Sequence, residues 1–406
     1  MIEPIQLYEH EDWAGQLARD DISFLLAEHP RINIRQDPLV SGQYILNPNE
    51  MVGVISLPSG RQLECYPKVP VSTLFYMLAV AYRFPVPWRD QAVHFEKIAE
   101  VLEHVAMYFA TLIEERINLG LYRQYVECED NLAVVRGRID FSNSLRRNFM
   151  LSHRHYCRYE EFTWDIPENQ IVRQTARMLA GWDFRPRARL RLARIDGSLD
   201  DVAPTTLPMD VFERFHYHRL NNDYMHLHSL CRLFLEGASL VERSGVFAFR
   251  SFLLDMNKLF EEFVAALLSE RTHGDVTVSR HTPVCLGREN KLRMFPDVTI
   301  KRGGEAIAVL DCKYKRLGRD EFENQDYYQA LAYCTALDLK RGLLVYPRHV
   351  AGSDEEIIVR NSDVSIRQLA IDLGGSREEF DRACDALTDN IFAWVKATEP
   401  EGCRVS

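Results

Sequence analysis

The sequence lacks any pair of cysteines spaced as C-x-x-C, and its nine cysteines are scattered without a regular framework. Scattered cysteines indicate reduced thiols rather than disulfides. Long apolar runs are also missing, since the longest, Leu74 to Ala81, is far shorter than the roughly 20 residues that span a bilayer. The start, MIEPIQLYEHEDW, is acidic and shows no secretion signal. These absences predict a cytoplasmic protein that does not contact a membrane.

A phosphate-binding loop of the form G-x-x-x-x-G-K-[ST] is absent as well, so we expect no nucleotide hydrolysis by this chain itself. Positive charge is scarce, because 49 Lys and Arg face 59 Asp and Glu, a formal net charge of -10. Affinity for duplex DNA comes largely from Lys and Arg. Work on DNA would therefore need a local basic cleft or a partner that holds the DNA. Basic residues are in excess at 271–319 and in RPRARLRLAR at 185–194. The run at 185–194 could also be the solvated edge of a strand or helix.

The most informative segment runs from Met294 to Lys313, with Phe-Pro-Asp at 295–297 and Val-Leu-Asp-Cys-Lys at 309–313. A short loop at 302–305, containing Gly303-Gly304, predicts a β-hairpin. Asp311 and Lys313 share a face because side chains alternate along a strand. Asp297 lies opposite Asp311 only if the loop has three residues or a Gly bulge shifts the register; a regular two-residue loop would pair it with residue 310.

Two carboxylates and a lysine on one face suit phosphodiester hydrolysis. The carboxylate oxygens could hold Mg²⁺, with Mn²⁺ as a possible substitute. The lysine ammonium could orient a water or neutralise charge on the scissile phosphate. An Asp-x-Lys triplet also arises by chance in a charged chain, so a hairpin with ordinary surface charges is an equal alternative for this segment by itself.

Two helices are predicted to flank the hairpin. Apolar residues recur with helical spacing from Asn257 to Glu270, and either Glu261 or Glu262 could reach the metal from that helix. Asp326 to Leu337 predicts a second helix, and Leu343 to Tyr346 predicts a buried strand. Helix, hairpin, helix and strand together indicate a small mixed α/β core.

These residues resemble the PD-(D/E)xK nuclease superfamily through a helix acid, Pro296-Asp297 and Asp311-Cys312-Lys313. Gln329 and Tyr333, four apart on one helix face, resemble its RecB-type branch. Over most of its length the chain is similar to McrC, the nuclease subunit of McrBC-type modification-dependent restriction systems. The blocks that carry this resemblance are GVISLPSGRQLECYPK (53–68), VRGRIDF (135–141), YCRYEEFTWDIPEN (156–169) and NKLFEEFV (257–264).

The resemblance implies site residues. Asp297, Asp311 and Glu261 would be metal ligands, and Lys313 would be the catalytic lysine. Glu261 directly follows Leu259-Phe260, as the acid does in the family, while Glu262 stays an alternative. Gln329 and Tyr333 would be supporting residues near the phosphate, although an ordinary amphipathic helix explains them equally well.

The resemblance also implies partners, a McrB-type AAA+ GTPase and double-stranded, modified DNA. The chain would cut DNA in that complex and stimulate the GTPase. Arg136 or Arg138 could reach a nucleotide site in trans, as arginine fingers do, or could pair locally. Two alternatives stay open: a stand-alone RecB-like repair nuclease, and a non-enzymatic adaptor that activates a partner NTPase.

The predicted fold is an α+β multidomain protein. We expect a β-rich, partner-facing domain at 1–88, a mainly helical middle region at 89–244, and a PD-(D/E)xK nuclease domain of restriction-endonuclease type at 245–406. Expected helices lie at 72–82, 90–119, 169–180 and 222–235, and 181–210 is expected to be mostly loop because of its prolines. His153, His155 and Cys157 share one face of an expected strand, but no closing ligand pair is evident, so we do not expect zinc there. The histidines at 216, 218, 226 and 228 are expected on the surface or between helices.

Overall fold

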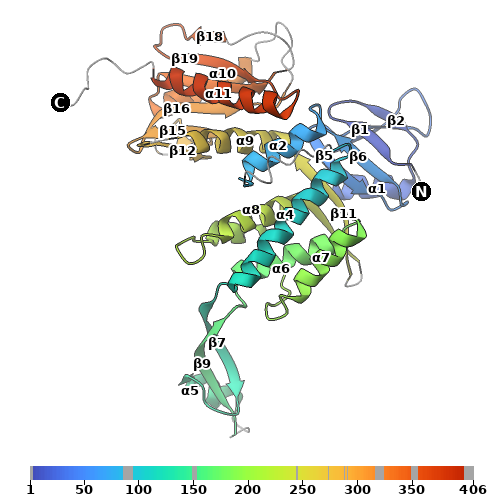
Figure 1. Cartoon of the computed structure of the whole chain (residues 1–406), viewed down its shortest axis with the longest axis vertical. Coiled ribbons are helices and arrows are strands. Elements are labelled where there is room, and N and C mark those ends of the chain that lie inside the picture. Colours follow the sequence, from blue (N-terminus) through green and yellow to red (C-terminus); the bar gives the residue numbers. More distant parts are fainter. Residues whose placement is uncertain are drawn as a thin grey trace, which may run out of the picture. The chain divides into compact units, whose positions relative to one another are not determined.

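A computed structural model describes residues 3–85, 95–148, 153–243, 246–272, 274–287, 289, 291–315, 324–348 and 355–396. The chain forms two compact units (Figure 1). Unit 1 combines Met1–Val101 with Leu253–Ser406, and unit 2 is Leu102–Phe252. The fold is mixed α+β with several sheets, as predicted. Within the described ranges, no helix is both long and apolar enough to cross a membrane.

The N-terminal part of unit 1 is rich in strands. β1 (Ile5–Tyr8) pairs in parallel with β6 (Gln62–Tyr66), which pairs antiparallel with β5 (Met51–Ser56). The turn at Pro58-Ser59-Gly60 joins β5 to β6. A second, antiparallel sheet has the order β2 (Trp13–Gly15), β4 (Tyr44–Asn47) and β3 (Asn33–Gln36). Apolar residues of these strands and of α1 (Arg19–Glu28) form one core cluster.

Helix α2 (Val71–Ala81) anchors this strand-rich part to the C-terminal part of unit 1. Most of its residues are buried, as expected for a helix that is apolar nearly all round. It contacts α9 (Met256–Arg271). The Thr73 hydroxyl donates to the Leu373 carbonyl at 2.9 Å, and the Tyr76 ring lies 5.6 Å from that of Phe380 on α11 (Arg377–Lys396). The segments predicted as the first and third domains are therefore packed together.

The C-terminal part of unit 1 is built on a six-stranded sheet of order β12-β15-β16-β17-β19-β18. The strand β16 is antiparallel to β15 and parallel to β17, and α10 connects β16 to β17. Residues of α10 pack with Val309, Leu344 and Tyr346 in one core cluster. The bounds are β12 (Val276–Arg280), β15 (Val298–Arg302), β16 (Glu305–Cys312), α10 (Asn324–Leu337), β17 (Arg341–Pro347), β18 (Glu355–Ile358) and β19 (Ser365–Ile371), with a small pair β13 (Val284–Cys285) and β14 (Arg293–Met294) beside them.

The hairpin β15–β16 has the two-residue loop Gly303-Gly304, with Arg302 opposite Glu305. Both glycines have positive φ, 58° and 92°, a conformation that favours glycine. The register shifts next to Ile300 and Lys301, which pair with Ala308 and Ala306 and leave Ile307 as the extra residue. Val298 consequently pairs with Leu310, so Asp297 comes opposite Asp311. A bulge therefore brings the two aspartates together, as predicted, but the extra residue is Ile307 and not a glycine.

Unit 2 is mainly helical, with a projecting strand arm that Figure 1 shows beyond the helices. Its helices are α4 (Ile98–Leu119, whose first residues belong to unit 1), α6 (Pro167–Ala180), α7 (Pro186–Gly197), η1 (Met209–Arg214) and α8 (Tyr224–Gly237). In the arm, β7 (Gln124–Leu132) pairs with β9 (His155–Thr163), which also pairs with β8 (Arg138–Ile139). Helix α5 (Phe141–Arg147) packs on β9. A further hairpin joins β10 (Ala238–Arg243) to β11 (Val246–Asp255).

Two helix predictions in this unit need comment. The expectation of loop at 181–210 was wrong at α7, because Pro186 occupies the first turn, where its missing N–H costs no hydrogen bond. Ala188, Leu192 and Ile195 then give α7 a buried stripe at helical spacing. The helix predicted at 90–119 begins at Ile98, and part of its expected start lies outside the described residues.

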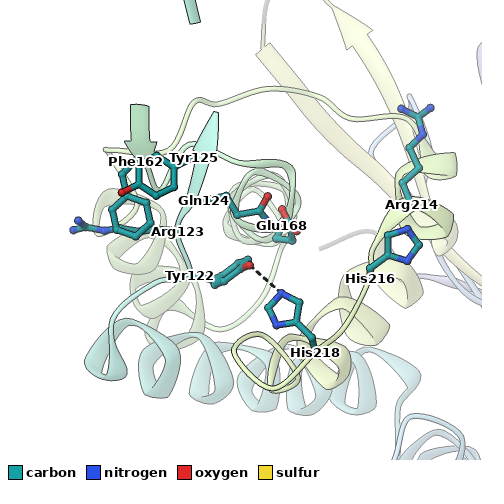
Figure 2. Close-up of a pocket in the computed structure, with 9 residues that line it drawn as sticks. All are labelled: Tyr122, Arg123, Gln124, Tyr125, Phe162, Glu168, Arg214, His216 and His218. Carbon is teal, nitrogen blue, oxygen red and sulfur yellow. Dashed lines mark hydrogen bonds between the residues drawn. The ribbon is translucent and has the colours of Figure 1, made fainter. Parts of the chain in front are cut away.

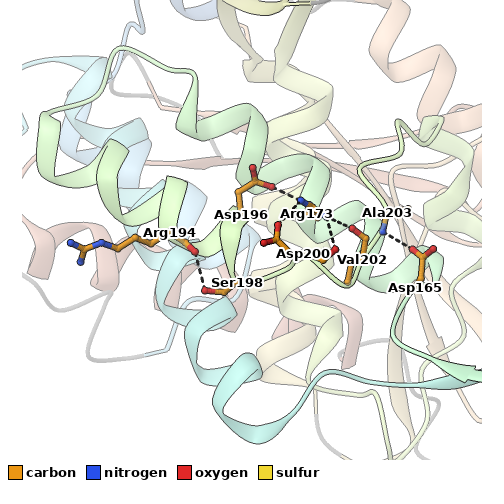
Figure 3. A network of polar contacts seen from close by, with 8 residues as sticks. All are labelled: Asp165, Arg173, Arg194, Asp196, Ser198, Asp200, Val202 and Ala203. Carbon is orange, nitrogen blue, oxygen red and sulfur yellow. Dashed lines mark hydrogen bonds and ion pairs between the residues drawn. The ribbon is translucent and has the colours of Figure 1, made fainter.

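A buried arginine fixes the chain after α7 (Figure 3). Arg173 is 9% exposed, and its guanidinium lies 3.2 Å from Asp196 Oδ1 and 3.1 Å from Asp200 Oδ1. It also donates to the Val202 carbonyl. Asp165 Oδ1 accepts from the Ala203 N–H at 2.7 Å. Side chains on and just before α6 therefore hold the irregular segment around Val202 and Ala203, which follows α7.

Candidate active site

Four predicted site residues converge in unit 1 from three elements. Glu261 lies on α9, whose N-terminus is capped by the Asp255 side chain, which accepts from the N–H groups of Asn257 and Lys258. Asp297 directly precedes β15, Asp311 lies near the end of β16, and Lys313 follows that strand. The backbone N–H of Lys313 still donates to Val345 at 2.9 Å, so the strand register extends through the lysine.

The contacts within this cluster are short and specific. Lys313 Nζ lies 2.7 Å from Asp311 Oδ2, and Asp297 Oδ2 accepts from the Cys312 N–H at 2.7 Å. Asp311 is 1% exposed, and its Oδ1 has no hydrogen-bond partner among the described residues. An orphaned, buried carboxylate oxygen is costly unless a cation or water satisfies it.

The three carboxylates raise one another's pKa values. Burial, together with the charge of Asp311, raises the pKa of Glu261 to about 7. Burial and the charge of Glu261 raise the pKa of Asp297 to about 6, and burial and the charge of Asp297 raise that of Asp311 to about 7. Burial lowers the pKa of Lys313, but the charges of Asp311 and Asp297 outweigh it and raise that pKa overall. One lysine does not offset three carboxylates, so the cluster favours an added cation.

Gln329 and Tyr333 connect α10 to both strands of the hairpin. Lys313 Nζ donates to Gln329 Oε1 at 3.0 Å, and Gln329 Nε2 donates to the Tyr333 hydroxyl at 2.7 Å. That hydroxyl donates to the Phe295 carbonyl at 3.3 Å. The chain of hydrogen bonds restrains the lysine ammonium beside Asp311.

The neighbouring residues Glu261 and Glu262 have different partners in the structure. Glu262 forms an ion pair with Arg280 of β12. A carboxylate oxygen of Glu261 instead belongs to a group of possible ligand atoms, with Asp297 and His281, that all lie within 4.8 Å of one another. Among the two glutamates, Glu261 is therefore the one that lies with the hairpin carboxylates.

His281 was missed by the sequence reasoning. It follows β12, and the pairing of Arg280 with Val298 places His281 opposite Asp297. Its Nε2 lies 3.9 Å from Glu261 Oε2. The available sequence signal was weak, because a lone histidine after a short strand gives no strand register, and 15 residues separate His281 from Pro296.

The arginines proposed to contact a partner lie in unit 2. Arg136 is exposed, lies 3.5 Å from Glu161 Oε1, and stacks 4.2 Å from the centroid of the Tyr159 ring. Arg138 is exposed on β8. Arg191 of α7 pairs with Glu114 at 2.7 Å, and Arg185, just before α7, pairs with Glu103 at 3.8 Å. Part of the basic run at 185–194 is therefore used in ion pairs with α4.

Among the described residues, the histidines of unit 2 belong to no group of three possible ligands that lie within 4.8 Å of one another. His228 is 1% exposed, and its ring nitrogens contact the Tyr217 hydroxyl and the Glu168 carbonyl, each at 3.0 Å. The prediction that it lies between helices is confirmed.

An open cavity of about 530 Å³ lies at the base of the arm in unit 2 (Figure 2). Aromatic and polar side chains line it. The Tyr122 hydroxyl lies 3.1 Å from His218 Nε2, a contact that Figure 2 marks with a dashed line. Glu168 accepts from Gln124 Nε2 at 2.9 Å. The cavity has a single lining carboxylate and no lysine, so the arrangement found in unit 1 is not repeated there.

Two sequence comparisons relate this chain to known proteins. The family model described as McrBC 5-methylcytosine restriction system component matches residues 46–347. The type IV methyl-directed restriction enzyme EcoKMcrBC of Escherichia coli (strain K12) is 23% identical over 314 residues, covering 69% of this chain and 86% of the relative.

A solved structure gives the same fold. It is the refined half-complex from the tetradecameric assembly of Thermococcus gammatolerans McrB AAA+ hexamers with bound McrC. The TM-score is 0.54 at 18% identity, covering 96% of this chain and 100% of the matched chain. Because the family model spans well over half of the sequence, this chain belongs to the McrBC 5-methylcytosine restriction system component family, as a McrC-type protein.

Proposed function

We propose that this chain is the nuclease subunit of a McrBC-like restriction complex, a Mg²⁺-dependent DNA endonuclease that acts when assembled with a McrB-type AAA+ GTPase and stimulates that GTPase. The observation that carries the nuclease assignment is the buried group of three carboxylates with Lys313 held between Asp311 and Gln329. Family membership and the McrB hexamers with bound McrC in the similar archaeal structure support the choice of partner.

The residues present fit a divalent cation with oxygen ligands. Glu261, Asp297 and Asp311 would hold Mg²⁺, since the unpartnered Oδ1 of Asp311 and the raised pKa values of all three groups favour added positive charge. When bound, the ion would polarise the phosphoryl group and lower the pKa of a water. Mn²⁺ would be a possible substitute, because it also binds carboxylate oxygens.

The side chains around this position have separate tasks. The Cys312 N–H donates to Oδ2 of Asp297 and so restrains that carboxylate for ligation. Lys313 keeps its proton, because its pKa is raised, and so can donate to an attacking water or to a phosphate oxygen. Gln329 and Tyr333 are positioning residues for that ammonium.

Different parts of the chain would contact the DNA and the partner. A net charge of -10, with Arg185 and Arg191 already paired to Glu103 and Glu114, supports delivery of the DNA by a partner. We assign the partner-facing role to residues 1–88, the mainly helical middle region to 89–244 and the nuclease domain to 245–406. Exposed Arg136 and Arg138 on the arm are our candidates for contact with the GTPase.

The test is cleavage of a methylated plasmid by the wild type and by Asp297→Ala, each with Mg²⁺, with and without the McrB-type partner and GTP. We expect cleavage only by the wild type with partner and GTP, and GTPase stimulation by both proteins. Cleavage by the wild type without a partner would favour a stand-alone repair nuclease. Stimulation by both proteins without any cleavage would favour a non-enzymatic activator.

A further inference from the structure

At one end of three neighbouring strands, β12, β15 and β16, polar side chains form a row across the sheet of unit 1. Val298 pairs with Arg280 on one side and with Leu310 on the other. The positions just beyond these pairs, His281, Asp297 and Asp311, are therefore opposite one another. Directly opposite residues on antiparallel strands lie about 4.5–5.5 Å apart at Cβ, close enough to share a ligand.

The histidine is held in this row by its backbone. Its N–H donates to the Asp297 carbonyl at 3.4 Å, and its φ is +43°, in the left-handed region. Non-glycine residues are uncommon there, and Asn, Asp and His are the types that tolerate it best. The strand end thus turns at His281 itself while the ring stays beside Glu261, with Nε2 3.9 Å from Glu261 Oε2.

We propose that His281 is a nitrogen ligand of the metal that the nuclease site binds, completing with Glu261 and Asp297 a set whose ligand atoms all lie within 4.8 Å of one another. The inference rests on the proposed nuclease function. It adds a ligand that the superfamily resemblance did not supply, because the motif residues are all carboxylates and a lysine.

A ring nitrogen changes which ion the site prefers. Mg²⁺ prefers oxygen ligands and near-ideal octahedral geometry, whereas first-row transition metals accept imidazole readily. With this imidazole added to the carboxylates, the site should therefore bind Mn²⁺ more tightly than Mg²⁺. The side chain of His281 is 47% exposed, so the ring can approach an ion without first breaking a buried packing arrangement.

The experiment measures metal binding to the metal-stripped full chain without DNA or partner. Mn²⁺ is the probe, with its affinity from titration calorimetry and its ligands from pulsed electron paramagnetic resonance. The main variant is His281→Asn, because Asn tolerates the left-handed backbone at this position. Exposed His226 on α8 gives the matched control, His226→Ala.

We expect the wild type and His226→Ala to show a directly coordinated ¹⁴N from imidazole, and His281→Asn to lose it. Second-shell changes at metal sites typically weaken binding about 10–100-fold, so loss of a direct ligand should weaken Mn²⁺ binding by at least about tenfold. Mg²⁺ binding should change much less, because Asn still offers an oxygen. The ratio of the two affinities should therefore fall.

A persistent imidazole signal in His281→Asn, or an unchanged Mn²⁺ affinity, overturns the assignment of His281. Asp297→Ala separates this failure from failure of the proposed nuclease site. If Asp297→Ala abolishes Mn²⁺ binding while His281→Asn leaves it intact, only the histidine ligand is wrong. If neither variant changes binding, the metal does not bind at this cluster, and both proposals fall.

Discussion

Neutralising Asp297 should stabilise the metal-free protein. The pKa of this carboxyl rises from 3.8 to about 6 through burial and the charge of Glu261. Each pKa unit corresponds to about 1.36 kcal/mol, so the ionised group costs unit 1 on the order of 3 kcal/mol at pH 8. Asp297→Asn removes that charge, and the Asn carbonyl can still accept from the Cys312 N–H. For a unit of this size we expect a rise in Tm of roughly 6–12 °C.

The sign depends on pH in a defined way. Because the folded-state pKa lies above the ordinary value, the folded chain binds the proton more tightly than the unfolded chain between about pH 4 and pH 6. Ionisation of wild-type Asp297 therefore removes stability as pH rises through this window. The advantage of Asp297→Asn should be absent at pH 4, grow towards pH 6 and be complete at pH 8.

The assay is thermal unfolding of EDTA-treated protein across this pH range, followed by circular dichroism. The control is Asp389→Asn on the exposed side of α11, for which we expect a change of no more than about 0.5 kcal/mol at any pH. Saturating Mg²⁺ should raise the Tm of the wild type and have little effect on Asp297→Asn. Equal stability of wild type and Asp297→Asn at pH 8, or a gain of the same size at pH 4, would refute this reasoning.

Three further outcomes are expected. Lys313→Ala should reduce DNA cleavage by the assembled complex about 10²–10³-fold, because losing one donor to the transition state usually costs that much. Calorimetry should show that Mg²⁺ still binds to this variant, and full cleavage activity would exclude a catalytic role for the lysine. Arg173→Met should destabilise unit 2 by about 3–5 kcal/mol in chemical denaturation, because Asp196 lies partly buried and would lose its partner; a change below about 1 kcal/mol would show that the network in Figure 3 contributes little. If Arg136 or Arg138 is an arginine finger, its Ala variant should lower partner-stimulated GTP hydrolysis by roughly 10³-fold, and an unchanged rate for both variants would exclude that role.

The sequence determined most of the local structure around the candidate site. The apolar stripe at 257–270, the glycine turn at 303–304 and the buried segment at 343–346 predicted α9, the hairpin and β17, and all three are confirmed. Asp311 and Lys313 could be placed together because strand alternation is a local rule. The resemblance to McrC followed from the order of such local blocks, and the family comparison confirms it.

Features that depend on strand register or on the rotation of a helix about its axis were decided only by the tertiary structure. Asp297 reaches Asp311 because Ile307 forms a bulge in β16, which a two-residue loop by itself does not determine. Glu261 and Glu262 differ by about 100° around the helix axis, and the burial of Phe260, Phe263 and Val264 decides which one faces the hairpin. His281 joins the row only through the pairing of β12 with β15.

The same distinction explains the wrong prediction at α7 and the missed role of Arg173. In a sequence, a proline predicts a break in a helix unless the helix is known to start at that residue. An arginine predicts surface charge unless its acidic partners in the fold are known. Residues 23 and 27 positions away supply those partners. Local periodicity is fixed by the backbone of each segment, whereas register, helix rotation and long-range ion pairs are fixed by the free energy of packing segments together, which only the folded chain specifies.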